Sequence, residues 1–144
     1  MSDIRILEGG IFRDHRGELV HMNGFNLDGA HRYYILKHDS PEVIRGWHGH
    51  QFEGKWFQCL RGSFRMAFVR PDDWENPSPD LKPEVFTLTA EKSELLCLPA
   101  GYANCIRALE PDSMLLVFSG KELPEALGDS WRWEPQMWEG DKIL

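Results

Sequence analysis

Long apolar runs and paired cysteines are both missing from this chain of 144 residues. Its three cysteines, Cys59, Cys97 and Cys105, form no Cys-x-x-Cys pair, so we expect reduced thiols that pack as small hydrophobic side chains. The apolar stretches are too short to cross a membrane, and the N-terminus has no apolar segment behind basic residues. These absences predict a cytoplasmic protein without a membrane partner.

Positive charge is also scarce, because 16 Lys and Arg residues stand against 23 Asp and Glu residues, for a net charge of −7. No block of basic residues occurs anywhere. A nucleic-acid partner requires a contiguous basic face, so the composition argues against DNA or RNA binding. A small anionic ligand needs only a few local Arg and Lys side chains and remains open.

Helical periodicity is absent before residue 120, and short strand-like runs separated by turn residues take its place. We expect strands at 32–37, 55–60, 63–70, 84–88, 94–98 and 113–118, with Arg61-Gly62 as a hairpin turn between the second and third. In the run 63–70, Phe64, Met66 and Phe68 would share one face. Many short strands in a chain of this length predict one all-β domain over residues 1–144, a barrel or double-sheet jelly roll.

Two segments stand apart from the strands. Residues 71–83 contain four prolines and predict a loop, either a surface excursion or a lid. Residues 120–144 form a C-terminal tail with Trp131, Trp133 and Trp138, which are too apolar to leave in water. We expect these rings to cover an open end of the barrel or to pack on a second subunit.

His48 and His50 are the most informative pair in the chain, because they lie two residues apart in a strand-like run. Residues i and i+2 of a strand face the same side, so both imidazoles project into one space. Such a pair is typical of a metal site or of proton transfer.

The segment around this pair resembles the first cupin motif, with Gly46-Trp47-His48-Gly49-His50 followed by Lys55 and Gly62. Residues 99–104, Pro-Ala-Gly-Tyr-Ala-Asn, resemble the second motif. The resemblance implies a cupin-type double-stranded β-helix, a jelly-roll barrel, with a short helical or irregular tail. Metal-binding cupins have Glu and a further His where this chain has Lys55 and Asn104. Two imidazoles beside an ammonium make a poor metal site, so we expect no metal and no cofactor.

Further motifs resemble two related branches of cupin enzymes. Residues 12–17, Phe-Arg-Asp-His-Arg-Gly, are similar to the Phe-x-Asp-x-Arg-Gly motif of dTDP-4-dehydrorhamnose 3,5-epimerases, and residues 98–104 are similar to their Pro-x-Gly-Phe-Ala-His segment. Residues 31–35, together with Arg-Gly-Trp-His-Gly-His at 45–50, resemble the TDP-4-oxo-6-deoxyhexose 3,4-ketoisomerases instead. The similarity extends to about residue 120.

This resemblance implies a metal-independent isomerase or epimerase of a nucleotide-linked, TDP-type 4-keto-6-deoxy sugar. His48 would remove the proton on C3, and His50 would move a second proton. Lys55 would stabilise the enediolate oxyanion, and Tyr33 or Tyr34 could serve as a further acid. A second set of residues would bind the substrate: Phe12, Arg16, Arg45 and Asn104. In the epimerases the Arg16-type residue can come from the partner subunit, so we expect a homodimer to which residues 1–30 contribute.

Two departures keep other functions open. Residues 117–124 lack the tyrosine that the epimerases carry in this region, and Asn104 replaces their histidine. A metal-dependent cupin oxygenase or isomerase is one alternative. A non-catalytic cupin that binds a nucleotide sugar is the other.

Overall fold

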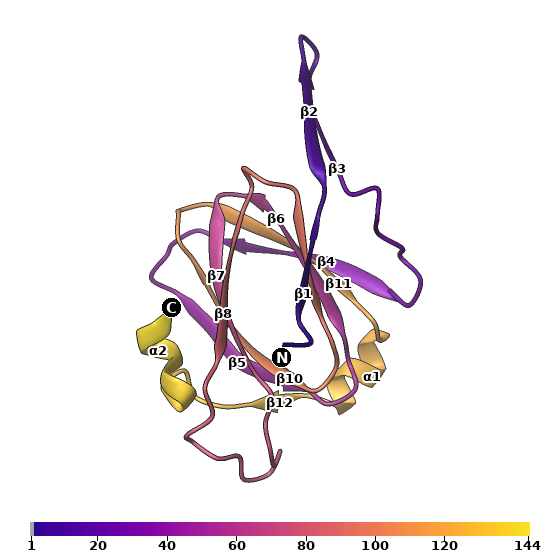
Figure 1. The fold of residues 1–144 in the computed structure, drawn as a ribbon. Helices are drawn as coiled ribbons and strands as arrows, with labels where there is room; N and C mark the ends of the chain where they lie inside the picture. Colours follow the sequence, from indigo (N-terminus) through magenta and orange to yellow (C-terminus); the bar gives the residue numbers. More distant parts are fainter. Residues whose placement is uncertain (1) are drawn as a thin grey trace.

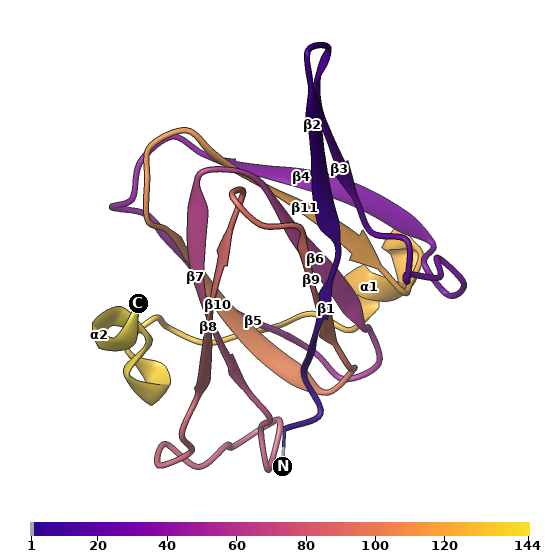
Figure 2. The same ribbon diagram turned by 45° about the horizontal axis from the view of Figure 1, so that its top comes forward.

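The computed structural model describes residues 2–144 and contains two antiparallel sheets of five strands each. The first sheet has the order β1 (Arg5–Glu8), β9 (Glu94–Leu98), β6 (Lys55–Arg61), β11 (Ser113–Ser119) and β4 (Arg32–His38). The second has the order β12 (Trp131–Arg132), β5 (Ile44–His50), β10 (Tyr102–Ala108), β7 (Ser63–Val69) and β8 (Glu84–Thr89). Their arrangement confirms the expected all-β jelly-roll barrel (Figures 1 and 2).

A two-stranded hairpin, β2 (Gly10–Asp14) and β3 (Gly17–His21), projects away from the barrel (Figure 1). Its apolar side chains Phe12, Leu19 and Val20 are exposed. At the other end of the chain, helix α1 (Leu123–Gly128) follows β11, and β12 leads to a 3-10 turn (Met137–Glu139) and to helix α2 (Gly140–Ile143). No helix within residues 2–144 is long and apolar enough to span a membrane.

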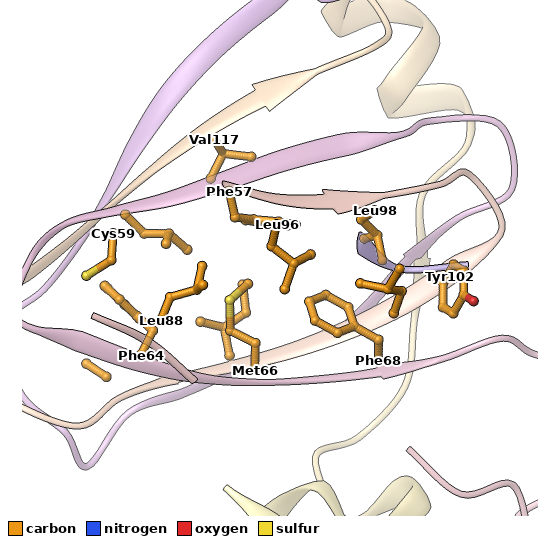
Figure 3. Close-up of a cluster of buried hydrophobic side chains, with 14 residues drawn as sticks. Phe57, Cys59, Phe64, Met66, Phe68, Leu88, Leu96, Leu98, Tyr102 and Val117 are labelled. Carbon is orange, nitrogen blue, oxygen red and sulfur yellow. The ribbon is translucent and has the colours of Figure 1, made fainter. Parts of the chain in front are cut away.

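The main core lies between the two sheets, where alternate residues of facing strands interdigitate (Figure 3). Phe64, Met66 and Phe68 of β7 are buried there, as their alternation predicted. All three cysteines are free and buried, and burial raises the pKa of Cys59 to about 11 and that of Cys105 to about 12. The prediction of packed thiols is confirmed.

The turn at Arg61-Gly62 is not a hairpin, contrary to the sequence prediction. β6 pairs with β9 and β11 in the first sheet, whereas β7 pairs with β8 and β10 in the second. Gly62 therefore turns a corner between sheets. It adopts a φ of 71°, and a Cβ there would lie 2.1 Å from the Ser113 hydroxyl oxygen, so glycine is required.

The C-terminal tryptophans cover a wall of the barrel, not its end. Trp138 and Trp133 pack with Trp47, Ala67 and Cys105 on the outer face of the second sheet. Residues 71–83 form the predicted loop, and Trp74 from this loop contacts the rings of Trp131 and Trp133. The tail and the loop therefore pack against each other over β5.

Candidate active site

A pocket of about 300 Å³ opens between the two sheets, beside helix α1. Its polar wall comes from strands β4, β5, β6, β10 and β12: Arg32, Tyr34, Arg45, His48, His50, Lys55, Asn104 and Arg132. Its apolar wall combines the end of the core with one side of α1: Leu36, Phe57, Ile106, Leu123, Ala126 and Leu127. Six of the eight site residues that were predicted from the sequence therefore line one pocket.

A β-bulge in β5 determines which side chains reach this pocket. Asn104 of β10 pairs with His48, but the next residue, Cys105, pairs with Gly46, so Trp47 is an extra residue on β5. Strict alternation would place Arg45 on the face opposite His48. The bulge shifts the phase by one residue. Arg45 consequently joins His48 and His50 in the pocket, while Trp47 points outward and donates its indole N–H to the carbonyl oxygen of Met137.

His50 is buried and held on its Nδ1 side. Nδ1 lies 2.7 Å from the main-chain oxygen of Asp129 and 3.1 Å from Oε2 of Glu53. A carbonyl oxygen only accepts hydrogen bonds, so Nδ1 carries the proton and Nε2 retains its lone pair. Burial and the Lys55 ammonium lower the pKa of His50, and the Glu53 carboxylate opposes this shift. The arrangement provides a neutral base with a fixed tautomer and a negative charge behind it.

His48 has a different environment, although its ring centroid lies only 4.4 Å from that of His50. Its Nε2 is 2.9 Å from the hydroxyl oxygen of Ser130. Burial, the neighbouring imidazole and the positive charges of Lys55, Arg132 and Arg45 lower the pKa of His48 to about 3. His48 is thus a neutral hydrogen-bonding group and a much weaker base than a free imidazole.

The carboxylate of Glu53 makes electrostatic contacts with both sheets, to Arg32 of the first and to His50 of the second. Its fully buried carboxylate accepts hydrogen bonds from the Ser119 hydroxyl and from Arg32, whose guanidinium lies 3.2 Å away. The ammonium of Lys55 is 3.9 Å from the same oxygen. Oε2 has no hydrogen-bond partner among residues 2–144, so it acts on His50 through its charge.

Lys55 and Tyr34 approach the pocket from the first sheet, opposite His48 and His50 of the second. The ammonium donates a hydrogen bond of 3.1 Å to the Tyr34 hydroxyl oxygen. Because Tyr34 accepts this bond, its own O–H proton remains available to a ligand in the pocket. A ligand between the sheets would therefore have a base on one side and an acid on the other.

The lining of this pocket is strongly cationic in a chain of net charge −7. Arg32, Arg45, Lys55 and Arg132 line it, and no carboxylate does. Glu53 neutralises part of the charge of Arg32 and Lys55 from behind. For Arg45 and Arg132, no carboxylate within residues 2–144 lies in salt-bridge range, so an anionic ligand would be attracted to them.

Two predicted residues, Arg16 and Phe12, do not reach the pocket. Both lie on the projecting hairpin, where Arg16 forms an ion pair of 2.6 Å with Asp14 and Phe12 is exposed. Within one chain the structure therefore does not bring them to the other six. A second pocket, of about 390 Å³, lies at the base of this hairpin, and neither His48 nor His50 lines it.

Several residues of the site were not predicted from the sequence: Arg32, Glu53, Asp129, Ser130 and Arg132. The carboxylate of Asp129 accepts hydrogen bonds from the backbone N–H groups of Gln51 and Phe52, which fixes the turn after His50. Glu53 could have been found from its position three residues after His50. The C-terminal residues gave no signal, because their place depends on the pairing of β12 with β5.

The side chains around the histidine pair are a poor set of metal ligands. Within the described residues no group of three or more His, Cys, Asp or Glu side chains is arranged to hold a metal ion. Glu53 is occupied by cationic partners, and Lys55 places positive charge next to the histidine pair. The donor set does not fit a resident metal.

No protein-family model and no curated protein matches the sequence. Solved structures, however, match the fold. A 3,4-ketoisomerase from Helicobacter canadensis has a TM-score of 0.73 at 18% identity, over 96% of each chain. A sugar 3,4-ketoisomerase from Thermoanaerobacterium thermosaccharolyticum, in complex with TDP, has a TM-score of 0.70 at 18% identity, over 99% of this chain and 98% of that one. A 3′-monoepimerase from Streptomyces bikiniensis, in complex with dTDP-quinovose, has a TM-score of 0.75 at 19% identity, over 98% of this chain and 77% of that one. At these identities the likeness shows the fold, which is the cupin-type jelly roll that the motifs predicted.

Proposed function

We propose that this protein is a metal-independent isomerase of a nucleoside-diphosphate-linked 4-keto-6-deoxy sugar, of the 3,4-ketoisomerase or 3,5-epimerase type. The observation that carries the proposal is the buried His50, whose proton sits on Nδ1 and whose free Nε2 belongs to a cationic pocket. The similar folds include a 3,4-ketoisomerase solved with TDP and a 3′-monoepimerase solved with dTDP-quinovose.

His50 is assigned the role of general base, in place of the His48 expected from the motifs. The proton on C3 of a 4-keto sugar is acidic because the ketone delocalises the negative charge of the carbanion. His50 Nε2 would take this proton, and Glu53 would stabilise the resulting imidazolium at Nδ1. His48, with its pKa of about 3 and its Ser130 partner, is suited to hydrogen-bonding the sugar.

The enediolate formed in this step carries its negative charge on O4. Lys55 would stabilise that oxyanion, and Tyr34 would supply a proton from the opposite side of the pocket. Transfer of the O3 proton to O4, followed by return of the proton from the His50 imidazolium to C4, would move the ketone to C3. Reprotonation at C3 from the other face would invert that centre. Asn104 would hydrogen-bond a sugar hydroxyl.

The diphosphate would bind at the solvent-exposed guanidinium groups of Arg45 and Arg132, which line the pocket and have no carboxylate partner within residues 2–144. The nucleoside would extend from this pocket of about 300 Å³ toward solvent. We further propose a homodimer, in which the projecting hairpin brings Arg16 and Phe12 of one copy to the pocket of the other. The exposed Leu19 and Val20 of this hairpin support that arrangement.

We propose that residues 1–144 act as a single domain in the cytoplasm. Three free thiols agree with a reducing compartment. We propose no cofactor, because every step above is a proton transfer between side chains and sugar.

Solvent exchange tests the proposed reaction. TDP-4-keto-6-deoxyglucose is incubated with the protein in D₂O, and NMR follows deuterium at C3 together with the position and configuration of the ketone. We expect incorporation at C3 in the wild type and about 10³-fold slower incorporation in His50→Asn. Absence of exchange, with tight binding of the sugar nucleotide, would instead identify a non-catalytic binding protein.

A further inference from the structure

His38 is not one of the residues that line the pocket, but it contacts Arg45, which is. It is the last residue of β4, and only 4% of its surface is exposed. Its ring packs edge-on against Phe64 of β7, and its backbone pairs with Ser113 of β11. A histidine in such surroundings is expected to have partners for its polar atoms.

Nε2 of His38 accepts a hydrogen bond of 3.3 Å from Nε of Arg45. A ring nitrogen that accepts from a guanidinium cannot carry a proton, so the proton of the neutral ring is on Nδ1. Nδ1 is buried and has no partner among residues 2–144. His38 therefore makes one side-chain hydrogen bond, through Nε2 to Arg45, and its Nδ1 has no hydrogen-bond partner among residues 2–144.

One of the three guanidinium nitrogens of Arg45 has a hydrogen-bond partner, and the other two have none among residues 2–144. Its Nε is bonded to His38, it has no carboxylate partner among residues 2–144, and its side chain lines the pocket. The two terminal nitrogens of a guanidinium form a fork that matches two oxygens of a phosphate group. Holding Nε fixes the plane of the fork and reduces the rotamer freedom that binding would otherwise remove.

Arg132, at the same pocket, provides the contrast. No hydrogen bond or ion pair of its guanidinium occurs among the described residues, so nothing holds it before a ligand arrives. Arg32 is the opposite case, because Glu53 and the carbonyl of Lys121 occupy it. Of the three pocket arginines, Arg45 alone is both anchored and uncompensated in charge.

We propose that His38 is a positioning residue that holds Arg45 for the diphosphate of the substrate, and that it makes substrate affinity dependent on pH. The inference rests on the proposed function for the identity of the anion. Neutral His38 accepts from Arg45, whereas protonated His38 cannot accept and repels the guanidinium. Acidification would therefore release Arg45 and weaken binding without affecting the reacting carbons.

The charged groups around His38 agree with a neutral ring near pH 7. Burial and the positive charge of Arg45 from β5 lower its pKa, and Asp39, the next residue in the chain, raises it. Of the residues that contact it from other strands, Phe64 of β7 is apolar and Ser113 of β11 is neutral.

Binding of TDP-glucose, measured by calorimetry between pH 5.0 and 7.5, tests the proposal. This ligand has no 4-keto group to react, and its diphosphate diester does not titrate in that range. Three variants are compared with the wild type: His38→Leu, which has no acceptor; His38→Gln, whose amide oxygen accepts at every pH; and Arg45→Met. Thermal unfolding of each variant monitors the fold.

We expect His38→Leu to weaken binding at pH 7.5 by about 10-fold, and His38→Gln by no more than about 3-fold. Wild-type affinity should fall toward pH 5.0, whereas the affinity of His38→Gln should stay level. In the Arg45→Met background, His38→Leu should have no further effect, because the two residues act as one unit. With the keto sugar, His38→Leu should raise KM and leave kcat unchanged.

The outcomes separate the two proposals. If the wild type binds TDP-glucose and His38→Leu binds it equally well at every pH, the role of His38 is refuted and the proposed function stands. If the wild type does not bind TDP-glucose at all, the proposed substrate class is refuted, and the diphosphate role of Arg45 with it. A pH dependence of binding that persists unchanged in His38→Gln would assign it to another group and also refute the role of His38.

Discussion

The imidazole of His50 and the carboxylate of Glu53 approach to 3.1 Å, and both side chains are buried. The proton on Nδ1 is nevertheless bonded to the carbonyl of Asp129, at 2.7 Å. The main chain thus fixes the tautomer and the carboxylate supplies the charge. In this site, orientation and electrostatic stabilisation of the His50 imidazole come from two different residues, which can be varied separately.

Glu53→Gln should slow C3 exchange by about 10- to 100-fold, because the imidazolium loses its negative neighbour while Asp129 keeps the tautomer. Glu53 opposes the lowering of the His50 pKa, so its loss should lower that pKa further. The acid limb of the pH profile of kcat/KM should then move to lower pH. Glu18→Gln, in an exposed ion pair with Arg13, is the matched control. If the acid limb of the profile stays at the same pH, Glu53 does not influence the pKa of the base.

His50→Asn and His48→Asn should have unequal effects on exchange. Loss of the base should reduce the rate by about 10³-fold, whereas loss of a neutral hydrogen-bonding group should reduce it by about 10-fold. Rates of deuterium incorporation at C3, measured at saturating substrate, compare the two. Equal losses, or a larger loss in His48→Asn, would return the role of base to His48.

The stability of the protein should fall in mild acid because of His48. The pKa of this group is near 6.5 when unfolded and about 3 when folded, so between these values the unfolded chain binds a proton that the folded chain does not. The contribution of His48 to stability is therefore fully present above pH 6.5 and is lost as the pH falls toward 3. In urea titrations at pH 7.5 and 5.0, the wild type should lose more stability than His48→Asn. His15→Asn, in the exposed hairpin turn, controls for the loss of an imidazole; if it behaves like His48→Asn, the assignment fails.

Gly49→Ala should destabilise the protein by about 1–3 kcal/mol. A Cβ at this position would lie 2.8 Å from a ring carbon of Trp74 and 3.0 Å from one of Trp133. Gly128→Ala is a suitable comparison, because its Cβ would meet nothing within 4 Å. Urea midpoints of the two variants give the difference. If both alanines are tolerated alike, the tryptophan rings do not pack tightly on β5.

Mixing two inactive variants tests the dimer. If the hairpin acts on the partner subunit, a dimer of Arg16→Ala with His50→Asn contains one intact site and one site with both changes. Random exchange of subunits should then restore about a quarter of the wild-type sites. Arg13→Ala, altered in the same hairpin, should not impair activity by itself. No recovery, with subunit exchange verified by mass spectrometry, would place Arg16 outside the site.

Local pattern was sufficient to predict most of the barrel and the centre of the site. The alternation in 63–70 and the His-x-His spacing depend only on neighbours in the chain, and the structure agrees with both. Arg45 reaches the pocket because of the bulge at Trp47, which alternation alone cannot show. Asp129 lies 79 residues from His50 and touches it only after the sheet has formed. Gly62 was misread because a tight turn does not reveal whether the next strand stays in the same sheet.

The position of Asp129 and Ser130 has a consequence for the order in which the protein is made. Every strand of the two sheets except β12 precedes these residues in the chain. A nascent chain that ends at Gly128 contains every residue of the main core, but it lacks the acceptor for the proton of His50 and the hydroxyl beside His48. The two histidines are therefore synthesised well before the residues that orient them, and a chain clipped before Asp129 would keep both imidazoles without these two partners.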